Sequence, residues 1–159
     1  MTARGGLRLT ADHTLVDAPA ADVVIVPGGV TSIVEKQQSL LEWIRVQRDT
    51  AEVLASVCTG AFILAEADLL TGTVTTHWED VDEMRRRFPH LEVDEDARFV
   101  DQGATVTSAG VSAGIDLSLH LVARLADLAT ALATARQMDY LWRPEDGETR
   151  PPLAGEGLI

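Results

Sequence analysis

Residues 52–70 read EVLASVCTGAFILAEADLL and join an apolar strand to an apolar helix through the only cysteine of the chain. The run from Glu52 to Val57 has the length and composition of a strand that is buried on both faces. Cys58 follows it directly, and Gly60 leaves room for the backbone where the helix begins. A residue at such a strand-to-helix turn is held exposed on a sharp elbow. The pattern therefore predicts a nucleophile elbow with Cys58 at its tip.

The position of Cys58 allows two interpretations. Free cysteines are among the most buried residues of proteins, so Cys58 can be a small core residue. A core cysteine, however, belongs inside a strand or a helix, whereas Cys58 stands at their junction, with a glycine two residues later. There the thiol faces the N–H groups of the first helical turn, which favour thiolate over thiol. We therefore expect Cys58 to be a reactive nucleophile.

A second strand with a glycine turn predicts an α/β fold. Residues 22–26 read DVVIV and are followed by Pro27, Gly28 and Gly29. Strands alternate with helices along the chain, which is typical of α/β domains with a largely parallel sheet. Ligands of such sheets bind at the carboxyl ends of the strands. If strands 22–26 and 52–57 are neighbours, their glycine-bearing loops face one pocket.

The remaining pattern continues this alternation. A weak extended stretch covers residues 7–15. We expect helices over 39–50, 60–67, 79–88, 112–126 and 129–142, and strands over 73–77, 97–100 and 104–109. The last two strands flank an Asp-Gln-Gly turn and predict a hairpin. We expect one domain over residues 1–142 and a flexible tail, rich in proline and glycine, over residues 143–159.

Composition and charge exclude several classes of protein. The chain has 159 residues, of which 46% are hydrophobic, and this fits a single globular domain. Its net charge of −12 argues against binding to nucleic acid or to an anionic membrane surface. A single cysteine forms no internal disulfide, which fits a reducing cytoplasm. The start, MTARGGLRLT, lacks the apolar segment of a signal peptide, and no apolar run approaches the roughly 18 residues of a membrane span.

Backbone groups on both sides of Cys58 are candidates to act with it. The turn at Gly28 and Gly29 offers N–H groups that can stabilise negative charge on a substrate atom. The N–H groups of Thr59 and Gly60 can join them from the other side of the elbow. Proline and glycine are also ordinary turn residues, so the same motif taken alone can be only a turn.

His77 ends the predicted strand TVTTH and can act as a base toward the thiol. A structural histidine that hydrogen-bonds nearby backbone is an equally good interpretation. Asp116 lies in the first turn of a later predicted helix and can point back toward the elbow. His120 lies on that helix in a polar stripe, which we interpret as a solvated face.

Other charged residues give weaker signals. Arg85, Arg86 and Arg87 end the predicted helix over 79–88 and can hold an anion, but we interpret them as a solvated helix end that complements the helix dipole. The chain has no cysteine pair and no His-x-x-x-His spacing, so we predict no metal site. It also has no P-loop motif, and its short glycine turns make no dinucleotide fingerprint.

Four segments together carry a resemblance to a known family. They are VVIVPGG at 23–29, SVCTGAFILAEADLLTGTVTTHW at 56–78, RRRFP at 85–89 and VTSAGVSAGIDLSLHLVARLA at 106–126. In this order they resemble the ThiJ/PfpI superfamily of class I glutamine-amidotransferase-like proteins. More narrowly, they resemble the isonitrile hydratase subgroup and the sensor domains of AraC-type regulators. The resemblance runs from about Leu7 to Trp142, and SVCTGAF and TSAGVSAGID are specific in combination.

The resemblance implies a flavodoxin-like three-layer sandwich, a cysteine nucleophile at Cys58 and a homodimer. It also implies that Thr59, the residue after the nucleophile, contributes to catalysis. An isonitrile hydratase is a lyase that adds water to an isonitrile to give an N-substituted formamide, and no cofactor is implied. In that reaction the thiolate attacks the terminal isonitrile carbon to form a thioimidate, from which water releases the product.

Two departures from the family pattern qualify this expectation. Glutamine amidotransferases place a histidine and then an acid after a late strand, but the corresponding loop here reads SAGVSAG at 108–114. Glutamine hydrolysis by a Cys-His-Glu triad is therefore disfavoured. The superfamily normally begins with a strand and a helix that carry an acid bonded to the thiol, whereas this chain begins after them, at TARGGLRLTADHTL. We therefore expect an N-terminally truncated version of the fold, in which no residue matches that acid.

Three functions follow as hypotheses. The first is a cysteine-dependent hydratase of the isonitrile type with a small-molecule substrate. The second is a non-catalytic module that senses a ligand, like those fused to AraC-type DNA-binding domains. The third is a stress-related protein whose thiol is oxidised or handles aldehydes. Turnover of an alkyl isonitrile separates the first from the others, and oxidation of Cys58 without turnover favours the third.

Overall fold

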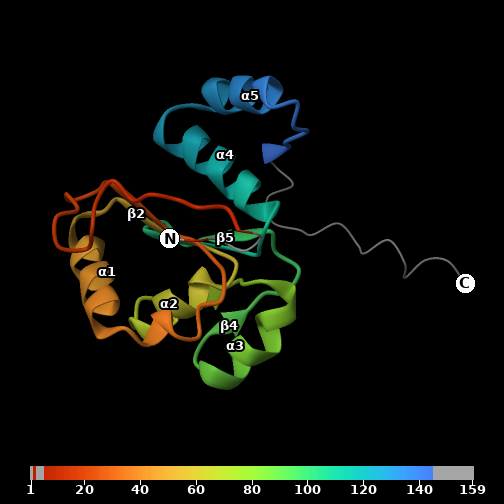
Figure 1. The fold of residues 1–159 in the computed structure, drawn as a ribbon. Helices are drawn as coiled ribbons and strands as arrows, with labels where there is room; N and C mark the ends of the chain where they lie inside the picture. The colour runs from red at the N-terminus through yellow and green to blue at the C-terminus, as the bar shows by residue number, and fades with distance from the viewer. Residues whose placement is uncertain (1, 3–5, 145–159) are drawn as a thin grey trace, which may run out of the picture.

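The computed structural model of the chain describes residue 2 and residues 6–144. Helices and strands alternate along it (Figure 1). In order they are β1 (Val23–Val26), η1 (Val34–Lys36), α1 (Gln38–Thr50), β2 (Val53–Val57), α2 (Gly60–Glu66), β3 (Thr73–Val74), η2 (Trp78–Asp80), α3 (Val81–Arg87), β4 (Glu92–Val93), β5 (Phe99–Asp101), β6 (Thr105–Ser108), α4 (Ala113–Leu125) and α5 (Leu128–Gln137), where η1 and η2 are 3₁₀ turns. The alternation confirms the predicted α/β class.

A four-stranded sheet in the order β1-β2-β6-β5 forms the centre of the molecule. β2 pairs in parallel with β1 and with β6, and β5 pairs antiparallel with β6 as the predicted hairpin. The register sets Val26 beside Ser56 and Val57 beside Ser108. Because parallel strands end at the same edge of a sheet, the loops that follow β1, β2 and β6 meet there. The prediction that the first two strands are neighbours is confirmed.

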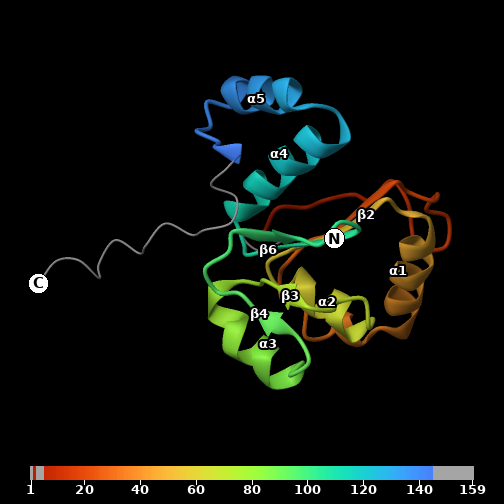
Figure 2. The same cartoon turned by 180° about the vertical axis from the view of Figure 1, so that it is seen from behind.

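Helices cover both faces of this sheet and complete a three-layer sandwich. Figures 1 and 2 show α4 on one side of the sheet and α1, α2 and α3 on the other. Leu54 of β2 belongs to the core under the latter helices, whereas its neighbours Val53 and Ala55 pack with Leu117 and Leu121 of α4. Successive side chains of a strand face opposite sides, so a strand covered on both faces is apolar throughout.

The strand predicted over 73–77 is shorter in the structure. β3 comprises only Thr73 and Val74 and pairs with β4 in a separate two-stranded sheet. The N–H of Thr75 instead donates to Oγ1 of Thr107 (2.9 Å), which fastens this segment to β6. His77 is the N-cap residue of η2, and its ring nitrogen Nδ1 accepts the N–H of Glu79 (3.4 Å). The segment after β3 is thereby carried to the edge of the main sheet.

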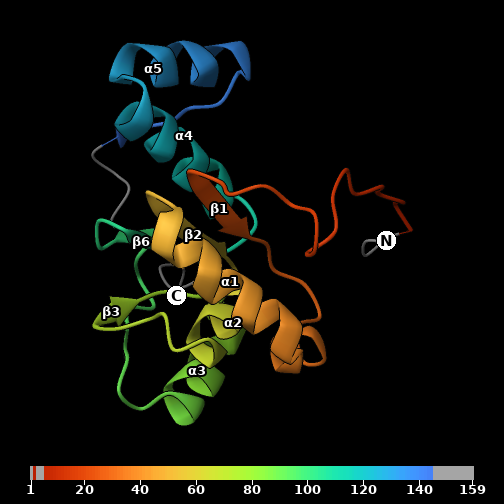
Figure 3. The same ribbon diagram turned by 90° about the vertical axis from the view of Figure 1, so that its left-hand side faces the viewer.

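The helix predicted over 129–142 also ends early. α5 stops at Gln137, and Asp139 takes a φ of 52°, which an α-helix does not accommodate. The chain then folds back, so Trp142 is buried in a small core between α4 and α5. Figure 3 shows α5 on the outer side of α4, away from the sheet. The tail predicted over 143–159 lies almost wholly outside the described residues.

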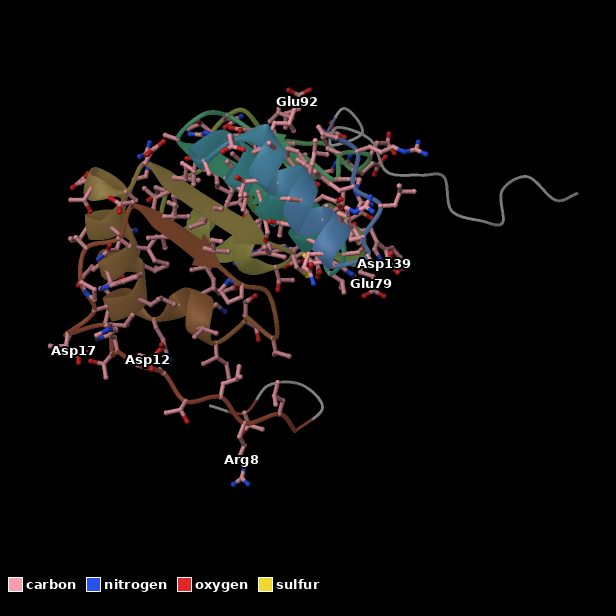
Figure 4. The ribbon with its side chains drawn as sticks, turned by 90° about the horizontal axis from the view of Figure 1, so that it is seen from above. Arg8, Asp12, Asp17, Glu79, Glu92 and Asp139 are labelled. Atoms are coloured by element: carbon pink, nitrogen blue, oxygen red, sulfur yellow. The ribbon has the colours of Figure 1, made fainter. Side chains whose placement is uncertain are left out.

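The described part of the N-terminal segment forms no strand before β1, apart from an isolated bridge between Thr2 and Arg8. The extended stretch expected over 7–15 runs as an exposed coil at the side of the molecule (Figure 3). None of the described helices is long and apolar enough to cross a lipid bilayer. Acidic side chains point outward around the periphery in Figure 4, as the net charge of −12 leads one to expect: Asp12, Asp17, Glu79, Glu92 and Asp139.

Candidate active site

Cys58 occupies a strained elbow between β2 and α2. Its φ is 59°, in the left-handed region, where a residue with a side chain costs about 1–2 kcal/mol. Three hydrogen bonds hold this conformation. The Cys58 N–H donates to the carbonyl of Ser108 (2.9 Å), and the Cys58 carbonyl accepts from the Thr76 hydroxyl (3.0 Å) and the Ala61 N–H (3.2 Å). The predicted strand-to-helix turn at Cys58 is therefore present, and its side chain is only partly buried.

The β1 loop, residues 27–33 between β1 and η1, passes close to the elbow, and glycine is required on each of the two segments at this point. A Cβ added to Gly28 lies only 2.6 Å from the Cβ of Cys58, and one added to Gly60 lies 2.2 Å from the carbonyl oxygen of Val26. Contacts below about 3 Å force one of the two backbones to move. Gly28 and Gly60 therefore let the two loops approach closely enough for the β1 loop to line one side of Cys58.

The Thr59 hydroxyl fastens the same two loops together. Its oxygen accepts the N–H of Gly29 and its proton goes to the carbonyl of Gly29, both at 2.9 Å. This arrangement changes the interpretation of two predicted site residues. The N–H of Gly29 is directed at the Thr59 hydroxyl and not at a substrate, and the hydroxyl proton of Thr59 is held by a backbone carbonyl. Thr59 and Gly29 lie at the site, and their contact holds the β1 loop against the elbow.

His77 lies on the opposite side of Cys58, beside two carboxylates. Its Nδ1 is 3.5 Å from Oδ2 of Asp80 and 3.7 Å from Oε2 of Glu79, and its side chain is 19% exposed. Among the described residues no hydrogen bond joins His77 to the thiol. Both side chains border Gly110 instead: a Cβ added there lies 2.8 Å from Cδ2 of His77 and 3.4 Å from Sγ of Cys58. The structure thus places His77 and the thiol on two sides of Gly110, with the Asp80 carboxylate beside Nδ1 of the histidine.

Gly110 is a site residue that the sequence reasoning did not single out. It lies in the loop after β6, and the following residue, Val111, has a φ of 42°. The signal in the sequence is the motif SAGVSAG, which by itself does not show that its first glycine reaches the elbow. Its meaning depends on β6 lying beside β2, because this pairing carries the loop after Ser108 to the elbow.

A cleft of about 260 Å³ opens beside the elbow, next to Thr59 and under the β1 loop. Its wall combines an aromatic ring, hydroxyl groups, three carboxylates and one arginine. The lining residues are Gly29, Val30, Thr31, Ser32, Glu35, Thr59, Phe62, Asp80, Glu83 and Arg87. A cleft of this size holds a small molecule, and its position makes Thr59 the link between it and Cys58.

The arginine triplet differs from its predicted role as a solvated helix end. Arg86 is largely exposed, but Arg87 turns inward to Glu35 and Glu66 and stacks on Phe62. Burial alone lowers the pKa of Arg87, yet its hydrogen bonds to these two carboxylates outweigh this effect and raise the pKa above its ordinary value. Arg87 therefore stays charged.

Asp116 does not reach the elbow. Its carboxylate pairs with Arg98 and accepts the Tyr140 hydroxyl (3.0 Å), and only 7% of the residue is exposed. His120, expected on a solvated face, instead bonds to Asp101 (2.7 Å).

Within residues 6–144 no group of three or more His, Cys, Asp or Glu side chains is placed to hold a metal ion. The residues gathered at the site are thus those of the elbow, its glycine walls and His77.

The amino-acid sequence resembles a known protein family and several characterised proteins. The DJ-1/PfpI family matches residues 1–124. Isonitrile hydratase of Pseudomonas putida is 35% identical over 163 aligned positions, which cover all of this chain and 69% of the hydratase. The HTH-type transcriptional regulator GbdR of Pseudomonas aeruginosa is 33% identical over 95% of this chain, which spans only 41% of the regulator.

Solved structures share the fold. A ThiJ/PfpI family protein from Pseudomonas syringae superposes with a TM-score of 0.81 at 28% identity, over 98% of this chain and 62% of that protein. Drosophila melanogaster DJ-1beta, at 19% identity, superposes with a TM-score of 0.68 over 80% of this chain and 68% of its own length. Fold and elbow define a flavodoxin-like α/β protein with a cysteine at the end of a central strand. The chain belongs to the DJ-1/PfpI family.

Proposed function

We propose that this protein is a cysteine-dependent lyase of the isonitrile hydratase type, which adds water to an isonitrile to give an N-substituted formamide. The observation that carries the proposal is the strained elbow, which presents a partly exposed thiol beside a cleft. The 35% identity to isonitrile hydratase over the whole chain supports the choice of substrate class. The chain spans 69% of that enzyme, so activity in this length of chain is itself part of the proposal.

The chemistry needs a nucleophile and two proton transfers. Sγ of Cys58 attacks the terminal carbon of R–N≡C, and that carbon takes the thiol proton to give the thioimidate R–N=CH–S–Cys. Water then adds to the same carbon, with one proton moving to nitrogen. The C–S bond breaks, the second proton returns to sulfur, and R–NH–CHO leaves. Covalent catalysis divides a difficult hydration into two easier steps.

The neighbours of the thiol take complementary roles in this scheme. His77 exchanges protons with sulfur and water. The carboxylates of Asp80 and Glu79, 3.5 and 3.7 Å from Nδ1, stabilise the imidazolium that forms when the ring takes a proton. Gly28 and Gly60 bring backbone N–H groups to the elbow, where charge develops during attack. Thr59 contributes by fixing the β1 loop rather than by donating a proton. No metal or cofactor enters the scheme.

Formamide production from one simple alkyl isonitrile, followed by ¹H NMR, tests the proposal. We expect multiple turnovers with the wild-type protein and none with Cys58→Ala. An adduct on Cys58 in the intact mass spectrum, the thioimidate, is expected early in the reaction. Absence of formamide after prolonged incubation of folded protein would rule the hydratase out.

The matches to regulators favour a second candidate, a module that binds a small molecule without converting it. GbdR and the regulator CdhR of the same organism are both 33% identical to this chain over most of its length. This candidate requires saturable binding of the small molecule that Cys58→Ala retains, with no product formed.

We also propose that the protein is a cytoplasmic homodimer. Light scattering of the purified chain tests the dimer. Selective oxidation of Cys58 without turnover remains the signature of the third hypothesis, a stress-related thiol protein.

A further inference from the structure

A buried carboxylate stands where the β1 loop ends. Glu35, in η1, is an ionisable residue that is only 2% exposed. Its Oε1 lies 2.9 Å from Nη2 of Arg87, and its Oε2 accepts the Thr31 hydroxyl at 3.3 Å. A buried carboxylate is costly unless it is paired and hydrogen-bonded, so Glu35 depends on Arg87.

Arg87 in turn connects three segments that surround the site. The same Nη2 lies 2.5 Å from Oε1 of Glu66, the last residue of α2. The guanidinium lies 4.9 Å from the ring centroid of Phe62 and 5.2 Å from that of Phe88. Arg87 therefore links η1 and α2 to its own helix α3, with the planar group held between rings and carboxylates.

The segments that Arg87 links are those that position Cys58. Residues 27–33 run from β1 to η1 and contain Gly28, where an added Cβ would lie 2.6 Å from the Cβ of Cys58. α2 begins directly after the elbow. The β1 loop is thus fixed at two points: near its start by Thr59, which bonds to Gly29, and at its end by the Glu35–Arg87 pair.

We propose that Glu35 and Arg87 are positioning residues for the reactive thiol, which keep the β1 loop closed against Cys58. Neither side chain touches the reacting atoms in this assignment, and both act through the loop. The turnover part of this inference rests on the proposed hydratase function, whereas the part that concerns access to the thiol does not. Because a shift of about 1 Å in a site can cost on the order of 10²-fold in rate, such a pair matters to catalysis without contacting substrate.

Two substitutions and one matched control test the pair. Glu35→Gln keeps the shape of the side chain and removes its charge, and Arg87→Gln removes the link to both carboxylates. Arg86→Gln is the control, because Arg86 is the neighbouring arginine of the same helix, is 69% exposed and pairs only with Glu83 among the described residues. Arg87→Lys keeps the charge without the planar fork and is expected to restore closure of the β1 loop only in part.

The decisive readout is the alkylation rate of Cys58 with a bulky aryl maleimide divided by its alkylation rate with small iodoacetamide. It is measured by intact mass well below each variant's thermal midpoint. A loosened loop admits the bulky reagent, so this ratio is expected to rise about tenfold in Glu35→Gln and Arg87→Gln and to stay at the wild-type value in Arg86→Gln. kcat for the isonitrile is expected to fall about tenfold in the two variants, with KM little changed.

The outcomes separate this inference from the proposed function. If the wild type gives no formamide, the hydratase proposal fails, and the alkylation ratio still decides whether the pair positions the thiol. If both variants only lower the thermal midpoint and keep the wild-type ratio, the pair is merely structural and the inference is wrong. Should Arg87→Gln fail to fold, the near-isosteric Glu35→Gln decides alone.

Discussion

The Thr59 hydroxyl and the backbone of Gly29 hydrogen-bond to each other twice, with both contacts at 2.9 Å. The two residues are 30 positions apart in the sequence, and their paired hydrogen bonds hold the β1 loop against the elbow. These two hydrogen bonds give the threonine after the nucleophile a structural role. The hydroxyl proton and one acceptor lone pair of Thr59 are both engaged with Gly29. The Thr59 proton is therefore held by a backbone carbonyl, and we assign the nucleophilic role to its neighbour Cys58.

Thr59→Val tests this pair of hydrogen bonds, because valine keeps the shape of threonine and removes both bonds. We expect the free energy of unfolding in urea to fall by about 1–2 kcal/mol, since a typical hydrogen bond contributes about 0.5–1.5 kcal/mol. Turnover is expected to fall as well, because the β1 loop moves away from Cys58. Thr59→Ser keeps the hydroxyl and should behave like the wild type. A loss in Thr59→Ser together with wild-type behaviour of Thr59→Val would mean that the methyl group, not the hydroxyl, matters.

Cys58→Ser is expected to fold and to lose its hydratase activity. Serine is close in size to cysteine and adopts the same backbone, but its hydroxyl is a far weaker nucleophile without a strong base. Formamide production should therefore drop to the level of a protein-free blank, while the thermal midpoint stays within a few degrees of the wild type. A serine variant that retains most of the rate would show that another residue attacks the substrate.

A pH-dependent contribution to stability is expected from Asp101, at the outer edge of the sheet. Partial burial by itself raises the pKa of Asp101, but hydrogen bonds from His120 and from the Gly103 N–H, with the charge of Arg124, outweigh it and hold the pKa below its ordinary value of 3.8. A carboxyl group with a lower pKa in the folded state stabilises the fold above the unfolded value. This stabilisation is lost as the pH falls below about 4 and through the folded pKa.

Asp101→Asn removes this contribution. The thermal midpoint of the variant should lie below that of the wild type at pH 7, and the gap should shrink as the pH is lowered from about 5 to below 3.8. Asp12→Asn, at an exposed position of the N-terminal segment, is the control and should leave the midpoint unchanged at both ends of this range. A gap that stays constant with pH would show that Asp101 acts through shape and not through charge.

The elbow could be predicted from the sequence because its signals are local. A continuous apolar run, one cysteine and a glycine two residues later describe a strand-to-helix turn without reference to the rest of the chain. The glycine turn after β1 is local in the same sense. What joins Gly28 to Cys58 is the parallel pairing of β1 with β2, and the alternation of strands and helices already favoured it.

Arg87 and His77 show what the sequence could not provide. A helix end with three arginines is solvated in most proteins, and nothing local distinguishes Arg87 from Arg86. The partner that does so, Glu35, comes from a distant turn, and only tertiary packing brings the two together. The placement of His77 was predicted as the end of a strand, but the strand ends earlier because Thr75 bonds to β6.

Gly110 gives the sharpest test of the site geometry, since it lies in the loop after β6 with no room for a side chain between the thiol and the histidine. Its φ lies outside the left-handed region, so alanine is allowed by the backbone, and only space opposes it. The new Cβ would lie 2.8 Å from Cδ2 of His77 and 3.4 Å from Sγ of Cys58, so the imidazole ring has to move.

We expect Gly110→Ala to slow alkylation of Cys58 by iodoacetamide, because the methyl group narrows access to sulfur, and to lower kcat/KM by ten- to a hundredfold, on the order expected for a displacement of about 1 Å. Overpacking should also cost about 1–3 kcal/mol of stability. Ser112→Ala is the matched control, because Ser112 lies in the same loop, is exposed and makes no side-chain cap to α4. If the two variants are alkylated at the same rate, Gly110 does not form a wall of the thiol site. In that case His77 has room to move freely beside Cys58, and its assignment as the proton-exchanging group loses its geometric basis.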